Sequence, residues 1–89
     1  MVHIGIIGDY DETKPTHPAT TAALLRAGEV LGESPRITWI STVELAQDTA
    51  ALDGCDAIMA SPGSPYADFQ GALAGIRYAR ERRRPFLGT

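Results

Sequence analysis

Cysteine is almost absent, since Cys55 is the only one in 89 residues. A single cysteine can form neither an internal disulfide nor a thiolate metal cluster, and this composition is typical of a reducing compartment. Long apolar runs are missing too, because stretches such as IGII and AIMA fall far short of the roughly 20 residues that a membrane-spanning helix needs. The N-terminus has no signal-peptide pattern. The sequence therefore predicts a cytoplasmic protein with no membrane partner.

Positive charge is also scarce. Eight lysines and arginines stand against eleven acidic residues, which gives a net charge of −3. No basic patch favours DNA or RNA, so nucleic acid is not an expected partner. The segment GIIGDY lacks the third glycine of a phosphate-binding loop and places acidic residues where the anion would sit. A two-component receiver would need an aspartate at the end of the third strand, where Ser61 stands instead.

The apolar residues follow two alternating periods. Four short apolar or β-branched runs predict buried strands of a parallel sheet. Helical spacing predicts a helix capped by Thr16 and ending at Gly32, a short helix or turn, and a strongly amphipathic helix. The expected strands are residues 3–8, 36–41, 56–61 and 85–88, and the expected helical segments are residues 16–32, 43–54 and 69–83. The first helix would bury Ala19, Ala23, Leu24, Ala27, Val30 and Leu31, and the last would bury Phe69, Ala72, Leu73, Ile76 and Ala79.

This alternation predicts an α/β chain with right-handed βαβ units and one parallel sheet covered by helices. The expected class is a three-layer flavodoxin-like or Rossmann-like fold with about four strands. No linker or repeat divides residues 1–89. In such sheets ligands bind beyond the carboxyl ends of the strands, so the loops after Gly8, Ser61 and Gly88 are the candidates for chemistry.

The first of these loops is acidic. Asp9, Asp11 and Glu12 could in principle ligate a magnesium ion. A solvated loop is the favoured interpretation, because carboxylates without a partner from the third strand make a poor site for a hard cation. No metal is therefore predicted.

The second loop, SPGSPYADFQG, places Gly63 between two prolines. A glycine there can adopt a conformation that points its N–H into open space, where the amide could stabilise an oxyanion. Considered by itself, the loop is better explained as a tight turn before a helix capped by Asp68.

The chain resembles a known family in its second half. The run DGCDAIMASPGSP and the run GALAGIRYARERRRPFLGT resemble the class I glutamine amidotransferases, most closely the amidotransferase domain of CTP synthase. That domain reads D-G-I-x-x-P-G-G, then I-x-Y-A-R-E, then P-F-L-G-I-C-x-G. The opening HIGIIGDY and the run AALLRAG also resemble its first strand and helix. The matching residues are Asp53, Gly54, Ile58, Pro62, Gly63, Ile76, Tyr78, Ala79, Arg80, Glu81, Pro85, Phe86, Leu87 and Gly88.

The resemblance implies a partial amidotransferase-like domain that hydrolyses glutamine or a related amide in its complete form, without a cofactor. Gly88 and Thr89 match the first two positions of a nucleophile elbow, so a cysteine or selenocysteine nucleophile would follow Thr89. Gly63 would supply an oxyanion amide, and Gly63 and Ser64 would contact the substrate. CTP synthase has a glycine and an aromatic residue in place of Ser64 and Pro65. Contacts to the substrate backbone therefore need not be the same.

Other reactive side chains fit structural roles. His3 opens a strand, His17 starts a helix, and neither matches the histidine of the family. Cys55 precedes the third strand, away from the candidate loops, and is expected to be a packing residue. The arginines near residue 82 complement the dipole of the last helix and are expected to face water.

Two functions remain open from the sequence. The first is the N-terminal half of an amidotransferase-like domain, inactive as 89 residues; the second is a noncatalytic flavodoxin-like binding or scaffold module. Residue 89 immediately precedes the expected nucleophile, and a UGA codon for selenocysteine there is one expected explanation, with an artificial end as the other. The fourth strand would be internal in a complete sheet. We therefore expect the chain to self-associate.

Overall fold

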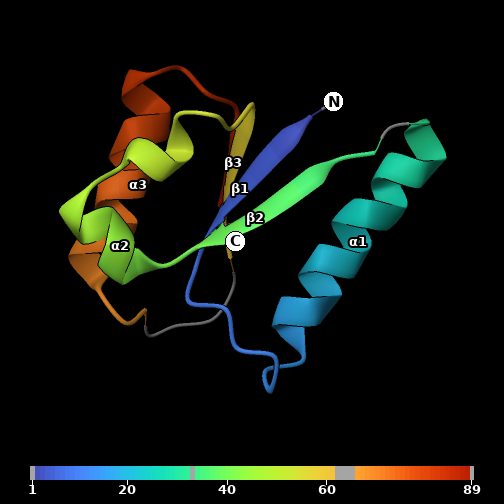
Figure 1. Cartoon of the computed structure of the whole chain (residues 1–89), viewed down its shortest axis with the longest axis horizontal. Helices are drawn as coiled ribbons and strands as arrows, with labels where there is room; N and C mark the ends of the chain where they lie inside the picture. Colours follow the sequence, from blue (N-terminus) through green and yellow to red (C-terminus); the bar gives the residue numbers. More distant parts are fainter. Residues whose placement is uncertain (1, 33, 62–65, 89) are drawn as a thin grey trace.

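A computed structural model of the chain describes residues 2–32, 34–61 and 66–88. Strands and helices alternate along it, as the two periods of the sequence predict (Figure 1). The strands are β1 (His3–Ile7), β2 (Arg36–Ile40), β3 (Ala57–Ala60) and β4 (Phe86–Gly88). The helices are α1 (Thr16–Leu31), α2 (Thr42–Gln47), the 3-10 helix η1 (Ala50–Leu52) and α3 (Phe69–Glu81).

The four strands form one sheet in the order β2-β1-β3-β4, and every neighbouring pair is parallel. In register, Ile6 of β1 lies between Trp39 of β2 and Met59 of β3. The chain crosses from β1 to β2 on one side and returns to β3 on the other. This order is that of a flavodoxin-like sheet, so the predicted α/β three-layer fold is confirmed.

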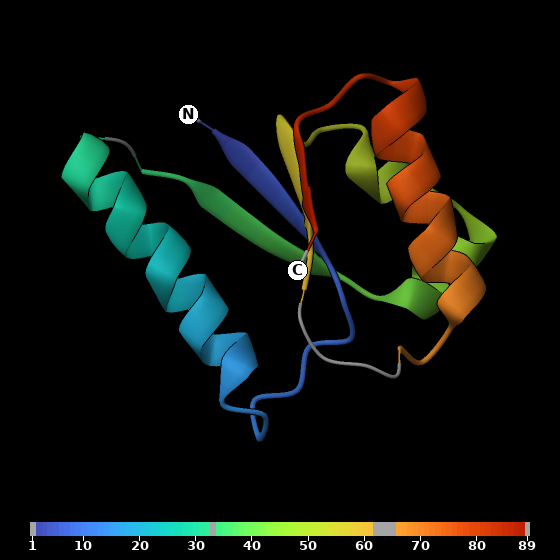
Figure 2. The same ribbon diagram turned by 180° about the vertical axis from the view of Figure 1, so that it is seen from behind.

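Helices lie on both faces of the sheet. Helix α1 stands on one face, whereas α2, η1 and α3 stand together on the other (Figures 1 and 2). The compact core lies under α2 and α3. These two helices pack side by side, and together they cover the apolar face of β1 and β3 on that side of the sheet. Its buried members include Ile7, Ile40, Leu45, Leu52, Ile58, Ala72, Tyr78 and Ala79.

Helix ends follow local side-chain chemistry. The side chain of Asp68 accepts a hydrogen bond from Gly71 N at 3.1 Å, which confirms the predicted cap of α3. Ser41 caps α2 in the same way through Glu44 N. The predicted cap at Thr16 is wrong, because Pro15 occupies that position and Thr16 is already helical. Helix α1 ends as expected at Gly32, whose positive φ of 76° suits a residue without a Cβ.

The predicted apolar face of α1 is largely uncovered. Val30 and Leu31 are both 78% exposed, and only Leu24 of the predicted set is partly buried. The spacing predicts the helix correctly, but the buried residues of α1 are His17 and Gly28 rather than the predicted apolar set. An apolar groove remains between Leu24 and the β3–β4 edge, lined there by Met59 and Leu87.

The buried face of α3 also differs from the prediction. Phe69 is 63% exposed and Leu73 is 37% exposed, whereas Gly71 and Gly75 are buried together with Ala72, Tyr78 and Ala79. The two glycines let α3 approach α2 and β1 more closely than a helix with larger residues could. Of the predicted face, Ala72 and Ala79 are buried and Ile76 packs against the core, whereas Phe69 and Leu73 lie outward.

The helices that the structure describes in residues 2–32, 34–61 and 66–88 include none that is long and apolar enough to cross a membrane.

Candidate strand-end site

The loops predicted to carry chemistry lie at one edge of the sheet. Gly8 directly follows β1, Ser61 directly follows β3, and Gly88 ends β4 in register with Ala60. The loop after β1 contacts the segment just before α3 at this edge, through Asp9 and Ala67. Figure 2 shows the loop after β1 and the start of α3 at this same end of the sheet. The chain departs in opposite directions from β1 and β3, and such a switch point is where open α/β sheets bind ligands.

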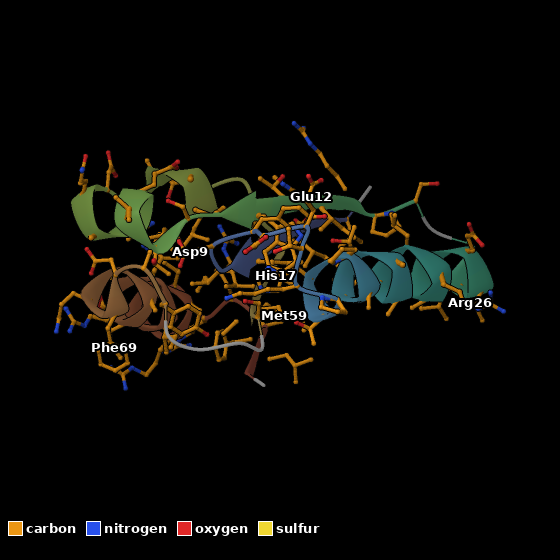
Figure 3. All side chains as sticks on the ribbon, turned by 90° about the horizontal axis from the view of Figure 1, so that it is seen from below. Asp9, Glu12, His17, Arg26, Met59 and Phe69 are labelled. Carbon is orange, nitrogen blue, oxygen red and sulfur yellow. The ribbon has the colours of Figure 1, made fainter. Side chains whose placement is uncertain are left out.

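Asp9 is the central acceptor of this edge. Its Oδ1 accepts a hydrogen bond from Thr42 N at 3.0 Å, and its Oδ2 accepts one from Ala67 N at 2.9 Å. The Thr42 hydroxyl donates to the same carboxylate at 2.9 to 3.0 Å. The Thr42 oxygen in turn accepts from Asp68 N at 2.8 Å. In Figure 3 Asp9 lies toward α2 and α3, which agrees with these bonds.

Hydrogen bonding favours the ionised form of Asp9. Partial burial raises the pKa of its carboxyl, but the hydrogen bonds from Ala67 and Thr42, with the charge of Lys14, outweigh burial and hold the pKa below the ordinary 3.8. A carboxylate that accepts several N–H and O–H groups is a strong, charge-assisted acceptor. The strand-end edge is thus held together by a negative charge.

This lowered pKa predicts an acid-sensitive part of the folding stability. A folded-state pKa below 3.8 contributes stability that is complete above that pH and is lost as the pH falls through the folded-state value. Chemical denaturation of the wild type and of Asp9→Asn between about pH 6 and about pH 3 measures this contribution. The wild type should lose more stability than the variant on acidification, and equal losses would contradict the assignment.

The carboxylates of the acidic loop are engaged by protein donors. Both oxygens of Asp9 are taken by protein donors, and Asp11 accepts from the backbone and hydroxyl of Thr13. Hydrogen bonding by Thr13 lowers the pKa of Asp11, whose carboxylate is exposed. No group of three or more His, Cys, Asp or Glu side chains able to hold a metal occurs within the described ranges.

An aromatic group lies on the α1 side of the same edge. The rings of His17 and Trp39 are 4.9 Å apart, and Tyr10 meets the Trp39 ring edge-on at 5.0 Å. His17 is buried, as a structural histidine would be, and its Nδ1 accepts from Asp11 N at 3.0 Å. Its Nε2 and the Oγ of Ser61 are buried and without a hydrogen-bond partner in the part of the chain that the structure describes.

The remaining reactive residues lie elsewhere. Cys55 is buried beside the amino ends of the strands, and burial raises the pKa of its thiol, so the predicted packing role is confirmed. His3 is at the same end, where its ring bonds Gly54 O and Thr38 Oγ1. The expectation that the arginines face water holds for Arg80, Arg82 and Arg83 but not for Arg84, which is partly buried and whose Nε is buried. Arg82 lies over the Tyr78 ring at 5.1 Å.

Three predicted site residues, Gly63, Ser64 and Thr89, lie outside the described residues. Gly88 is described as the last residue of β4. The sequence interpretation missed Thr42 and Ala67, which complete the Asp9 network. Thr42 had a readable signal, because Ser41 and Glu44 have the spacing of a helix capping box and place Thr42 at the first turn. Nothing in the sequence around Ala67 marks it as a donor.

Comparison with known proteins finds similar segments in CTP synthases. The chain is 30% identical over 91 residues to CTP synthase of Saccharolobus solfataricus, which covers 98% of this chain and 17% of that relative. It is 33% identical over 89 residues to the Pyrobaculum calidifontis enzyme, with 98% and 17% covered. The Nitratidesulfovibrio vulgaris enzyme is 33% identical over 89 residues, with 98% and 16% covered.

No protein-family model matches the chain. The chain spans about a sixth of the length of the CTP synthases to which it is similar. The similarity nevertheless runs through every strand and helix described above, since it extends over 98% of the residues. Over nearly its whole length, the chain is related to a segment of CTP synthase.

Proposed function

We propose that the chain is the N-terminal part of a glutamine amidotransferase-like unit, and that the complete unit hydrolyses glutamine or a related amide. The relationship to CTP synthase over 98% of the residues is the observation that carries this proposal. The fold supports it, because Ala60 and Gly88 are paired in register and the ends of β3 and β4 are therefore adjacent. The predicted oxyanion segment and the predicted elbow follow these two ends.

The chemistry proposed for the complete unit would use residues of this chain together with residues outside it. A cysteine or selenocysteine after Thr89 would attack the side-chain amide of the substrate, with a histidine further along as base and acid. The Gly63 amide would stabilise the tetrahedral oxyanion, and Ser64 would contact the substrate. The partner is thus a small glutamine-like amide, and the residues call for no cofactor.

A chimera tests the proposal. Residues 1–89 replace the matching segment of the Pyrobaculum calidifontis CTP synthase, and ammonia release from glutamine is measured. We expect the chimera to release ammonia from glutamine faster than a variant of the parent enzyme that lacks the nucleophile. Circular dichroism and size-exclusion chromatography must first show that the chimera folds like the parent. A folded chimera without glutamine hydrolysis would contradict the proposed function.

Two substitutions at one position test the Gly63 assignment in that chimera. Gly63→Pro removes the backbone N–H, whereas Gly63→Ala retains it. Losing one oxyanion donor costs about 10² to 10³ in kcat, so the proline variant should fall by that factor. The alanine variant should fall by less, because it keeps the N–H and loses only the freedom of a residue without a Cβ. A proline variant with undiminished kcat would reject Gly63 as a donor and leave the wider proposal standing.

A further inference from the structure

The first observation concerns where the chain goes between β3 and α3. It leaves β3 at Ser61, whose N–H donates to Ile7 O of β1 at 3.0 Å. It returns at Ala67, whose N–H donates to Asp9 at 2.9 Å. Both ends of this crossing are therefore attached to the last residues of β1 and the loop that follows it. Tyr66 adds a third tie, because its hydroxyl donates to Ser61 O at 3.0 Å.

The second observation is that Asp9 fixes two helices at once. Its carboxylate binds Thr42, the first residue of α2, through both the backbone N–H and the hydroxyl. Thr42 is fully buried and accepts from Asp68 N, and Asp68 caps α3. One ionised side chain thus sets the place of the first turns of α2 and α3 relative to β1.

The donors around Asp9 need an acceptor with two free oxygens. Thr42 N and Ala67 N bind opposite oxygens of the carboxylate. An asparagine keeps the shape of the side chain but offers one carbonyl oxygen and an NH₂ group, which cannot accept. One of the two N–H groups would then face a donor. The loss of order should be largest at the Asp9 edge, because the core under α2 and α3 is made of apolar side chains.

We propose that Asp9 is a positioning residue: by holding Thr42 and Ala67 together, it fixes the place of Ala67, where the chain enters α3, relative to the end of β1. This inference rests on the proposed function in one respect, namely that the crossing carries the oxyanion amide. Asp9 itself touches no reacting atom in this scheme. Its role is to fix the position of Ala67 relative to the end of β1.

Amide hydrogen exchange in the 89-residue chain, followed by NMR, tests the positioning directly. Asp9→Asn should speed the exchange of the Ala67 amide by at least about tenfold, the effect expected from losing a hydrogen bond to a charged group. The Ile58 amide, which donates to Pro85 O inside the sheet, should accelerate much less than the Ala67 amide, because it reports only the loss of overall stability. Asp11→Asn is the matched control, because the carboxylate of Asp11 accepts from Thr13 in its own loop, and the Ala67 rate should not change.

Two results would overturn the inference. An unchanged Ala67 rate in Asp9→Asn would show that the carboxylate does not hold the crossing. Equal acceleration of Ala67 and Ile58 would show that Asp9 merely stabilises the whole fold.

A second arm separates this inference from the proposed function. In the chimera, Asp9→Asn should lower kcat by about tenfold or more while Asp11→Asn leaves kcat unchanged. If Ala67 responds but the unsubstituted chimera does not hydrolyse glutamine, the positioning role stands and the proposed function fails. If the chimera is active and Asp9→Asn keeps full kcat, the positioning role fails and the proposed function stands.

Discussion

Replacing Gly71 with alanine is expected to destabilise the chain severely. A Cβ added at Gly71 would fall on the carbonyl oxygen of Thr42, well inside van der Waals contact, and 2.6 Å from the carbonyl carbon. These are backbone atoms of α2, and they cannot rotate away as the end of a side chain can. In an unconstrained helix the same change would stabilise by about 1 kcal/mol, so the sign of the effect is diagnostic.

The expected cost is about 3 kcal/mol or more, since overpacking against side chains alone already costs 1 to 3 kcal/mol. For a domain of this size that corresponds to a fall in Tm of roughly 12 to 24 °C. Thermal unfolding followed by circular dichroism measures it. Gly54→Ala is the matched control, because the nearest atom to its added Cβ is 3.9 Å away, and its Tm should stay close to that of the wild type. A Gly71→Ala protein as stable as this control would contradict the close packing of α2 and α3.

The 89 residues alone are expected to release no ammonia from glutamine above the uncatalysed rate. Their single cysteine, Cys55, is buried beside the amino ends of the strands, and burial raises the pKa of its thiol. A thiol that is protonated and shielded is a poor nucleophile. The loss of a nucleophile and its base as a unit costs about 10⁶-fold in kcat.

A coupled assay for glutamate and ammonia measures this activity, with an intact CTP synthase relative as the positive reference. Cys55→Ser should leave the background unchanged. A rate that is above background in the wild type and absent in Cys55→Ser would show that this thiol reacts, and would contradict the assignment of Cys55 to packing.

The strands and the fold class could be predicted because parallel strands buried on both faces are short continuous apolar runs. Residues 3–7 and 57–60 show such runs, and each strand was expected within one or two residues of where it lies. Asp68 was also predictable, because a cap depends only on residues three positions away. These features are local, and local chemistry determines them.

The orientation of the helices could not be predicted in the same way. Periodicity marks a helix, but which of its faces is buried depends on how closely a neighbour can approach. Gly71 and Gly75 carry no hydrophobic signal, yet neither position has room for a Cβ next to its neighbours in α2 and β1. The Asp9 network could not be predicted for a related reason, because it joins Asp9 to Thr42 and Ala67 across long stretches of chain. Taken alone, Asp9 and Ala67 are typical of a solvated loop.

The place of β1 in the sheet has a consequence for how the chain is made. This strand is synthesised before β2 and β3 and pairs with one on each side, so Ile4 must wait for Ala57 before its second neighbour exists. Until then one edge of an apolar strand stays open to other chains, which is the state most prone to misassociation. The pairing that completes β1 spans most of the 89 residues, and such long-range contacts close slowly. During translation, β1 therefore emerges before its two neighbours and remains unprotected on one edge until β3 has been made.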